Sequence, residues 1–167
     1  MYPVSDAFLR AVRSNTRKYF WTGTIVTKGR MTYEFGAKEI VKGSGYISRQ
    51  CCGSTEIELG TVYAAEMGIT LLSDIDRYTL EDALVTIVFH LVLADGSVED
   101  VPMGVFEVSE ANRLAKCLEL KAYDFMLRFD KSFNGFETVG TAYDFIALCC
   151  KMCRVCLLYT SPSPRDS

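Results

Sequence analysis

The sequence predicts an α+β fold that is mainly antiparallel β, either a barrel-like or a split-sheet domain, with short helices at three places. From residue 19 to 72 the chain alternates β-branched and aromatic runs with glycines, which is typical of strands joined by turns. Residues 83–93 place their apolar side chains mainly on one face of an extended segment, as a strand bordering a core requires. The helical period occurs near the N-terminus, just after residue 123 and over residues 142–153.

The size and composition of the chain limit the classes of protein to which it can belong. With 167 residues it suits one domain, which we expect to occupy residues 1–155 and to be incomplete at its C-terminus. The net charge of -3 gives no basic footprint, so we expect no specific nucleic-acid binding. The longest apolar run, residues 83–94, is too short to span a bilayer, and no signal-peptide pattern is visible. We therefore expect synthesis in the cytoplasm, no membrane segment and no disulfide framework for the seven cysteines.

An amphipathic helix is predicted over residues 5–14. Ser5 is a suitable N-cap, and apolar residues recur behind it at helical spacing. This stripe comprises Ala7, Phe8, Ala11 and Val12. The one basic cluster of the chain comprises Arg10, Arg13, Arg17 and Lys18. We interpret it as a solvated face, with a phosphate or partner contact as the alternative.

A β-hairpin is predicted around Asp95-Gly96, a dipeptide that favours a two-residue type I′ turn. In the strand before the turn, one face carries Val85, Ile87, Phe89, Leu91 and Leu93. In the strand after it, Pro102 indicates an edge position or a bulge, because proline has no N–H to give to a ladder. Both strands are therefore expected to pair closely around this turn.

The last third of the chain predicts one further strand and two helical segments. Residues 118–122 alternate as a half-buried strand does, and residues 123–130 follow as a helical turn or two. We expect Tyr123, Met126 and Leu127 to pack inward from that turn. Thr141 and Asp144 form a capping-box pattern at the start of the helix over 142–153. Its apolar stripe comprises Ala142, Phe145, Ile146, Cys149 and Cys153.

The usual catalytic motifs are missing from the sequence, which contains no G-x-S-x-G, P-loop, G-x-G-x-x-G or H-E-x-x-H pattern. His90, the one histidine, shares the face opposite the apolar one and has no Asp, Glu or Cys at ligand spacing. We expect it to be a surface or packing residue. The acidic pairs Glu56 with Glu58 and Asp74 with Asp76 are expected to be solvated. We predict no catalytic residue and no cofactor, and we do not expect this chain to be an enzyme.

Four cysteines near the C-terminus suggest a metal site at first sight. Cys150, Cys153 and Cys156 match the first three positions of a four-iron ferredoxin run, but the fourth Cys and its Pro are missing. Cys149 and Cys153 lie one helical turn apart on the apolar stripe, where reduced cysteine behaves as a small buried hydrophobe. Cys51-Cys52 has no second pair at metal spacing. We therefore predict no metal, with a thiol or zinc protein using Cys149, Cys150 and Cys153 as one alternative.

The final residues resemble translated adapter DNA rather than a natural coding sequence. The stretch "CLLYTSPSPRD" at 156–166 is similar to one reading frame of the transposase mosaic-end adapter used in tagmentation libraries. We therefore expect residues 156–167 to be a disordered tail of adapter origin and the natural sequence to be cut near Val155. Cys156 then drops out of the cysteine run.

Two stretches resemble the N-terminal region of tail hub proteins from siphophages and prophages, the group that includes tail-associated lysins and prophage endopeptidase tail proteins. They are "IVKGSGYISRQCCGSTEIELGTVYAAEMGITL" and "VPMGVFEVSEANRLAKCLELKAYDFMLRFDKSF". In the second stretch a Pro-x-Gly-x-Phe strand precedes one that ends in Ala-Tyr-Asp, followed by Phe-Asp-Lys. The likeness covers most of residues 1–155.

The resemblance implies a structural part of a virion tail. In that family the N-terminal region forms a β-rich hub at the tail tip, self-associates as a trimer, continues the tail tube and contacts the distal tail protein. It implies synthesis in a bacterial host and location in the virion tail, with any peptidoglycan-cleaving activity in a C-terminal domain beyond residue 155. The other alternative is a stand-alone β-rich module that binds carbohydrate or protein through a face around Tyr33, Tyr46 and Tyr63.

Overall fold

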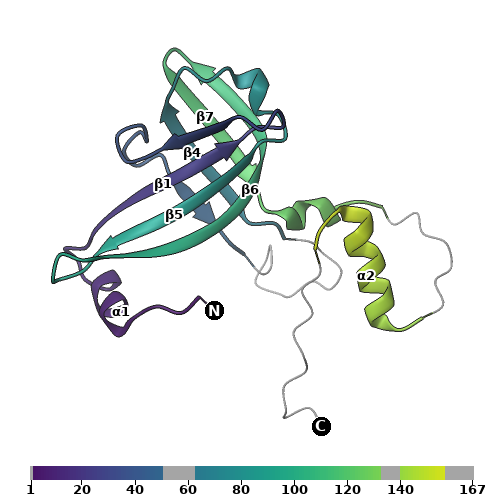
Figure 1. The fold of residues 1–167 in the computed structure, drawn as a ribbon, viewed down its shortest axis with the longest axis horizontal. Coiled ribbons are helices and arrows are strands. Elements are labelled where there is room, and N and C mark those ends of the chain that lie inside the picture. Colours follow the sequence, from purple (N-terminus) through teal and green to yellow (C-terminus); the bar gives the residue numbers. More distant parts are fainter. Residues whose placement is uncertain (1, 51–62, 133–139, 157–167) are drawn as a thin grey trace, which may run out of the picture.

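The computed structural model describes residues 2–50, 63–132 and 140–156 and confirms an α+β fold dominated by antiparallel β (Figure 1). The described strands form one open sheet in the order β2-β1-β5-β6-β7-β4-β3. They are β1 (Lys18–Val26), β2 (Thr32–Phe35), β3 (Tyr46–Ser48), β4 (Glu66–Leu72), β5 (Leu84–Val92), β6 (Val98–Leu114) and β7 (Cys117–Tyr123). The helical elements are α1 (Asp6–Val12), the short 3-10 helices η1 (Arg77–Leu80) and η2 (Phe125–Phe129), and α2 (Ala142–Cys153).

The long strand β6 joins the two halves of the sheet. Residues 98–107 pair with β5, and residues 107–114 pair with β7. The register with β5 shifts between Pro102 and Gly104, which leaves Met103 as a bulge. Gly104 has a φ of 121°, which glycine adopts without a steric penalty. Bulges bend the strand that carries them, so β6 turns here and the sheet curls.

The curled sheet encloses one hydrophobic core built from both halves. Its most buried side chains, each at most 1% exposed, are Ile25, Met67, Ile69, Leu71, Leu80, Ala83, Val85, Ile87, Phe106, Leu118, Leu120 and Ala122. The segment between β2 and β3 crosses from one end of the sheet toward the other. Ile40 bridges Leu71, and the Val41 N–H donates to the Thr70 carbonyl at 2.9 Å. The predicted alternations in the strands before and after β6 are confirmed, because Val85, Leu91 and Leu118 face inward.

One end of the sheet is a three-stranded arm, formed by residues 18–22 of β1, 88–92 of β5 and 98–102 of β6. The predicted N-terminal helix is confirmed as α1, which contacts β5 of the arm (Figure 1). Phe8 is buried, and its ring meets the Phe89 ring edge-on at a centroid distance of 6.3 Å. Ser5 caps α1, and its backbone N–H and hydroxyl donate to the carboxylate of Glu99 in β6.

The turn between β5 and β6 differs from the predicted type I′ turn. Leu93 and Ser97 pair across a three-residue loop, and the Gly96 N–H donates to the Leu93 carbonyl at 3.0 Å. Gly96 has a φ of 84°, whereas Asp95 is not among the residues with positive φ, so this is a type I turn followed by a left-handed glycine. The prediction is wrong because the Asp95 carboxylate accepts from the hydroxyl and backbone N–H of Ser97, an Asx turn that needs no positive φ at Asp95.

Pro102 fulfils both of its predicted roles. It lies directly before the bulge at Met103, and residues 98–106 of β6 have no strand partner on the side away from β5 within the described chain. Proline is tolerated at such a position because the ladder does not need its N–H.

The two C-terminal helices are confirmed as elements, but their predicted buried faces are wrong. In η2, Tyr123 just before the helix is half-buried, whereas Met126 and Leu127 are 45% and 40% exposed. In α2, Phe145 and Ile146 are likewise exposed, and the buried residue is Cys150. The cause is tertiary: α2 packs mainly against η2 and not against the sheet, so its own apolar stripe is not the face that becomes covered.

Some predictions fall outside the described residues. These are the part of the predicted strand region over 51–62, the loop over 133–139 and the adapter-like tail after Cys156. Within the described part of the chain no helix is long and apolar enough to cross a membrane.

Candidate functional site

His90 is the centre of a polar cluster on the arm. Its Nε2 lies 2.7 Å from the Thr22 hydroxyl, and its Nδ1 lies 2.6 Å from the Asp100 carboxylate. The imidazole also stacks on the Phe20 ring at a centroid distance of 4.6 Å. Only 14% of the His90 side chain is exposed, so it is a packing residue, as predicted, but one with a carboxylate partner that the sequence pattern did not reveal.

The carboxylate of Asp100, the imidazole of His90 and the hydroxyl of Thr22 follow one another as in a proton relay. The position of Thr22, however, favours a structural role for this cluster. Nucleophiles commonly sit on loops or at strand ends, whereas Thr22 lies within β1 and its backbone pairs with Val88. Thr22, His90 and Asp100 come from three adjacent strands. The cluster therefore ties β1, β5 and β6 together across one face of the arm.

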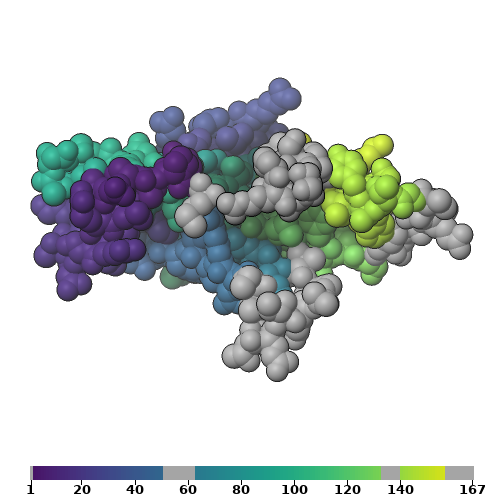
Figure 2. Space-filling view, turned by 90° about the horizontal axis from the view of Figure 1, so that it is seen from below, coloured from purple at the N-terminus to yellow at the C-terminus, as the bar shows by residue number. Residues whose placement is uncertain are grey.

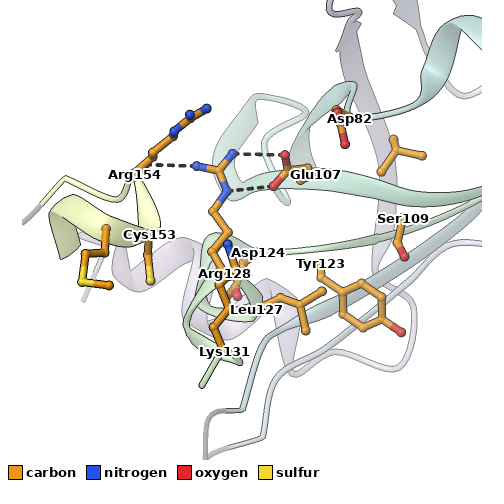
Figure 3. Close-up of a pocket in the computed structure, with 12 residues that line it drawn as sticks. Asp82, Glu107, Ser109, Tyr123, Asp124, Leu127, Arg128, Lys131, Cys153 and Arg154 are labelled. Atoms are coloured by element: carbon orange, nitrogen blue, oxygen red, sulfur yellow. Dashed lines mark hydrogen bonds and ion pairs between the residues drawn. The ribbon is translucent and has the colours of Figure 1, made fainter. Parts of the chain in front are cut away.

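A second site is the hollow of about 560 Å³ between β6, η2 and the end of α2 (Figure 3). Arg128 crosses it: its guanidinium binds both carboxylate oxygens of Glu107, with Nε to Oε2 at 2.9 Å and Nη2 to Oε1 at 3.1 Å. Its Nη1 donates to the backbone carbonyl of Arg154 at 3.0 Å, just after α2. The hydrogen bond to Glu107 raises the pKa of Arg128, which stays charged. Arg128 thus connects the sheet to α2.

A third site is a cleft of about 560 Å³ beside the outer edge of β1, called the edge cleft below. Its lining combines three cations with apolar and aromatic groups and includes no carboxylate among the described residues. The cations are Arg17, Lys18 and Lys42; the other lining residues are Tyr19, Phe20, Trp21, Ala37, Ile40, Gly43 and Gly45. Two members of the predicted basic cluster, Arg17 and Lys18, therefore line a cavity, while Arg10 and Arg13 are exposed on or beside α1. The cleft combines them with Lys42 from a separate segment.

The structure does not bring the three predicted tyrosines together as one exposed platform. Tyr33 packs against the hydrophobic core, and Tyr63 is half-buried. Tyr46 is exposed on β3, where its hydroxyl donates to the Glu66 carboxylate at 2.5 Å. This hydrogen bond raises the pKa of Tyr46 and lowers the pKa of Glu66. The arrangement does not favour a carbohydrate platform around these residues.

The cysteines and acidic pairs do not form a metal site within the described chain. No group of three or more His, Cys, Asp or Glu side chains among residues 2–50, 63–132 and 140–156 is placed to hold a metal ion. Cys150 is buried, and Cys149 and Cys153 are half-buried in α2. Asp76 caps η1 by accepting the Tyr78 N–H at 3.1 Å, which is a structural use of a carboxylate. The other predicted pairs, Glu56 with Glu58 and Cys51 with Cys52, lie outside the described residues.

Comparison with known proteins gives a likeness of fold. No protein-family model and no curated protein matches the sequence. Among solved structures, the chain is similar to one from the "virion of native gene transfer agent (GTA) particle", with a TM-score of 0.51 and 11% sequence identity. The match covers 79% of this chain and 49% of that chain, so this chain spans about half the length of the protein it matches. At this identity the likeness concerns the fold alone.

Proposed function

We propose that this protein is a structural component of a phage tail tip or baseplate hub. In this role it self-associates, as a homotrimer, to continue the tail tube, and it contacts the distal tail protein and other tail-tip proteins of the virion tail. The observation that carries the proposal is the likeness of fold to a virion protein over 79% of the chain. The resemblance of two long sequence stretches to tail hub proteins points in the same direction.

The surface of α2 supports a role in assembly. This helix exposes four large apolar side chains, each between 44% and 50% exposed: Tyr143, Phe145, Ile146 and Met152. The adjacent η2 exposes Met126 and Leu127. Exposed large apolar side chains concentrated on neighbouring elements are typical of sites of protein–protein contact. We assign the self-association surface to this side of the molecule.

The proposed role depends on surfaces and not on chemistry, so we propose that this chain is not an enzyme. The most enzyme-like cluster, Thr22 with His90 and Asp100, joins three strands of the arm. Any catalytic activity of a longer protein would then belong to a different part of it.

Light scattering on the full 167-residue chain tests the proposal. We expect a trimer whose proportion rises with protein concentration, and a loss of trimer in Ile146→Ser and Met152→Ser. Leu114→Ser is the matched control, because Leu114 is 82% exposed but lies on β6, away from α2. A chain that stays monomeric over a wide concentration range would contradict the proposed self-association.

A further inference from the structure

We propose that the outer edge of β1 over residues 18–22, together with the edge cleft, is a docking site for an extended strand of a partner protein that carries carboxylates. The inference rests on the proposed structural role and deepens it by naming the chemistry of a partner segment. The partner strand adds to the arm beside β1, and its carboxylates meet the cations of the cleft.

The first argument is that β1 has a free edge. β1 pairs with β5 along its whole length, from Lys18 to Val26, but with β2 only from Gly23 to Val26. Residues 18–22 therefore have no strand partner on their outer side within the described chain. An unpaired edge presents N–H and C=O groups in a row, which is the template for adding a strand.

The register identifies which backbone groups are available. Leu93 and Ser97 form a hydrogen-bonded pair, and bonded and non-bonded pairs alternate in an antiparallel ladder, so His90 directs its backbone groups toward β1. His90 is paired with Phe20 of β1, so the N–H and C=O of Phe20 are hydrogen-bonded to β5. Tyr19 and Trp21 must then direct theirs outward. No described residue accepts or donates a backbone hydrogen bond at these two positions on the outer side.

The second argument is charge. Arg17, Lys18 and Lys42 line the edge cleft, and no described carboxylate lies among them, although the whole chain has a net charge of -3. Lys18 on a free edge also disfavours pairing with unrelated strands, because an apolar or cationic strand offers no negative charge to pair with its ammonium group. A strand that carries carboxylates both neutralises these cations and completes the ladder.

The free backbone edge favours a polypeptide over a single-stranded nucleic acid. Bases bind by stacking on exposed rings, and here one face of the Tyr19 ring and one face of the Phe20 ring are occupied, although the side chains are 54% and 36% exposed. Tyr19 packs on Phe89 at a centroid distance of 5.4 Å, and Phe20 stacks on His90. A Cβ added at Gly45 would lie 3.1 Å from the Trp21 ring, so the loop closes over that ring as well. A polypeptide strand can pair with the N–H and C=O groups of the free edge over residues 18–22, whereas a nucleic acid has no matching ladder of such groups.

The opposite edge of the arm differs, and this argues against a second copy of the chain as the occupant. In β6 the outward groups of the same alternation belong to Val98, Asp100 and Pro102, and Pro102 has no N–H to donate. Met103 then bulges and interrupts the ladder. The β6 edge of a second copy would therefore pair incompletely with the β1 edge, so we assign the occupant to a different protein.

Peptide binding to the full chain tests the charge argument. The probe is a fluorescent ten-residue peptide of alternating Thr and Glu, with alternating Thr and Lys as its comparison. We expect saturable binding of the acidic peptide in low salt, weakened about fivefold by Lys42→Glu. Lys116→Glu is the matched control: Lys116 is also exposed but lies in the turn between β6 and β7. Equal weakening by both variants, or equal binding of both peptides, would overturn the site.

A pair of substitutions at Tyr19 tests the strand edge itself. Tyr19→Pro removes an outward N–H that β1 does not use for β5, and Tyr19→Val removes the same ring but keeps the N–H. We expect the proline variant to lose peptide binding and the valine variant to retain it. Amide hydrogen exchange in the unsubstituted chain gives a second readout, because bound peptide should protect the amides of Tyr19 and Trp21. If neither amide gains protection in the presence of saturating peptide, the edge is not the site.

The remaining outcomes also decide the inference, and they are separate from the trimer test. Binding of oligothymidylate as tightly as the acidic peptide would overturn the choice of a polypeptide. Self-association that Tyr19→Pro abolishes would show that a second copy occupies the edge, which also overturns it. If the chain is a monomer that binds the acidic peptide, self-association is contradicted and the docking site is supported. If it is a trimer that does not bind the peptide, self-association is supported and the docking site is contradicted.

Discussion

The two α-helices lie at opposite ends of the molecule and are attached in different ways (Figures 1 and 2). Both have side-chain N-caps, Ser5 for α1 and Thr141 for α2. The short helix α1 buries Phe8 against the sheet, whereas the longer α2 buries one residue, Cys150, and connects to the sheet through Arg128 of η2. Helix length and capping therefore do not determine how firmly a helix is held; the burial of a large side chain does.

This difference matters for the proposed role. A helix that is packed by a large side chain resists displacement, whereas one held by a polar connection can adjust its position with little loss of buried apolar area. In the proposed assembly α1 supports the arm that carries the docking edge, and α2 presents its exposed apolar face to a neighbouring subunit.

The largest expected effect in this comparison is at the anchor of α1. Phe8→Ala removes a buried ring that contacts Phe89, and we expect it to lower the free energy of unfolding by about 3 kcal/mol. Urea denaturation measures the change. Leu9→Ala is the control: Leu9 is 40% exposed in the same helix, so its loss should be below about 0.5 kcal/mol. Similar losses in both variants would mean that α1 is not anchored through Phe8.

The connection of α2 gives the next effect. Arg128→Ala leaves the half-buried Glu107 without its partner and frees the Arg154 carbonyl, and we expect a loss of about 2 kcal/mol. The loss should be concentrated in α2, so hydrogen exchange of its amides should accelerate while that of β5 changes little. Lys131→Ala, which changes another cation of the same hollow, should leave both unchanged. Uniform acceleration across the chain would contradict a connection that is specific to α2.

The existence of both helices was predictable from sequence, because caps are local: Ser5 and the pair Thr141 with Asp144 act within three residues of their partners. The buried face of α2 was not predictable, because it depends on which element lies beside the helix. An apolar stripe indicates a face that can be buried, but in α2 the large side chains of that face, Phe145 and Ile146, are exposed.

The residue that lies opposite His90 on β6 depends on the length of the loop between β5 and β6. A two-residue loop at Asp95-Gly96 would pair His90 with Val101, whereas the observed three-residue loop pairs it with Asp100. A shift of one residue moves every side chain to the other face, so the predicted turn type concealed the carboxylate next to the imidazole. The positions of Thr22 and Lys42 were not predictable for a different reason. Thr22 comes near His90 through the long-range pairing of β1 with β5, and Lys42 comes near Arg17 and Lys18 because the segment after β2 lines the edge cleft.

A smaller effect is expected at the cap of α2. Thr141→Ala removes the side-chain acceptor for the Asp144 N–H and should destabilise this helix by about 1 kcal/mol. Because α2 contributes little to the core, the midpoint of global urea unfolding should stay nearly constant while exchange of the first-turn amides accelerates. Thr141→Ser keeps the hydroxyl and should behave like the unsubstituted chain. A large shift of the global midpoint in Thr141→Ala would instead indicate that α2 unfolds together with the sheet.

The smallest effect concerns pH and acts on the cap of α2, because this cap contains the titratable side chain of Asp144. The Asp144 carboxylate accepts the Thr141 backbone N–H at 2.8 Å and then the Thr141 hydroxyl, and these bonds lower the pKa of Asp144. A carboxyl whose pKa is lower in the folded state stabilises that state above its ordinary pKa, here 3.8, and loses this contribution as the pH falls through the lowered value. The exchange protection of α2, measured relative to that of the core strand β5, should therefore decline below about pH 4. Asp144→Asn should remove this decline and Asp74→Asn, a substitution outside the helix, should preserve it; an identical decline in Asp144→Asn would show that another group controls the helix.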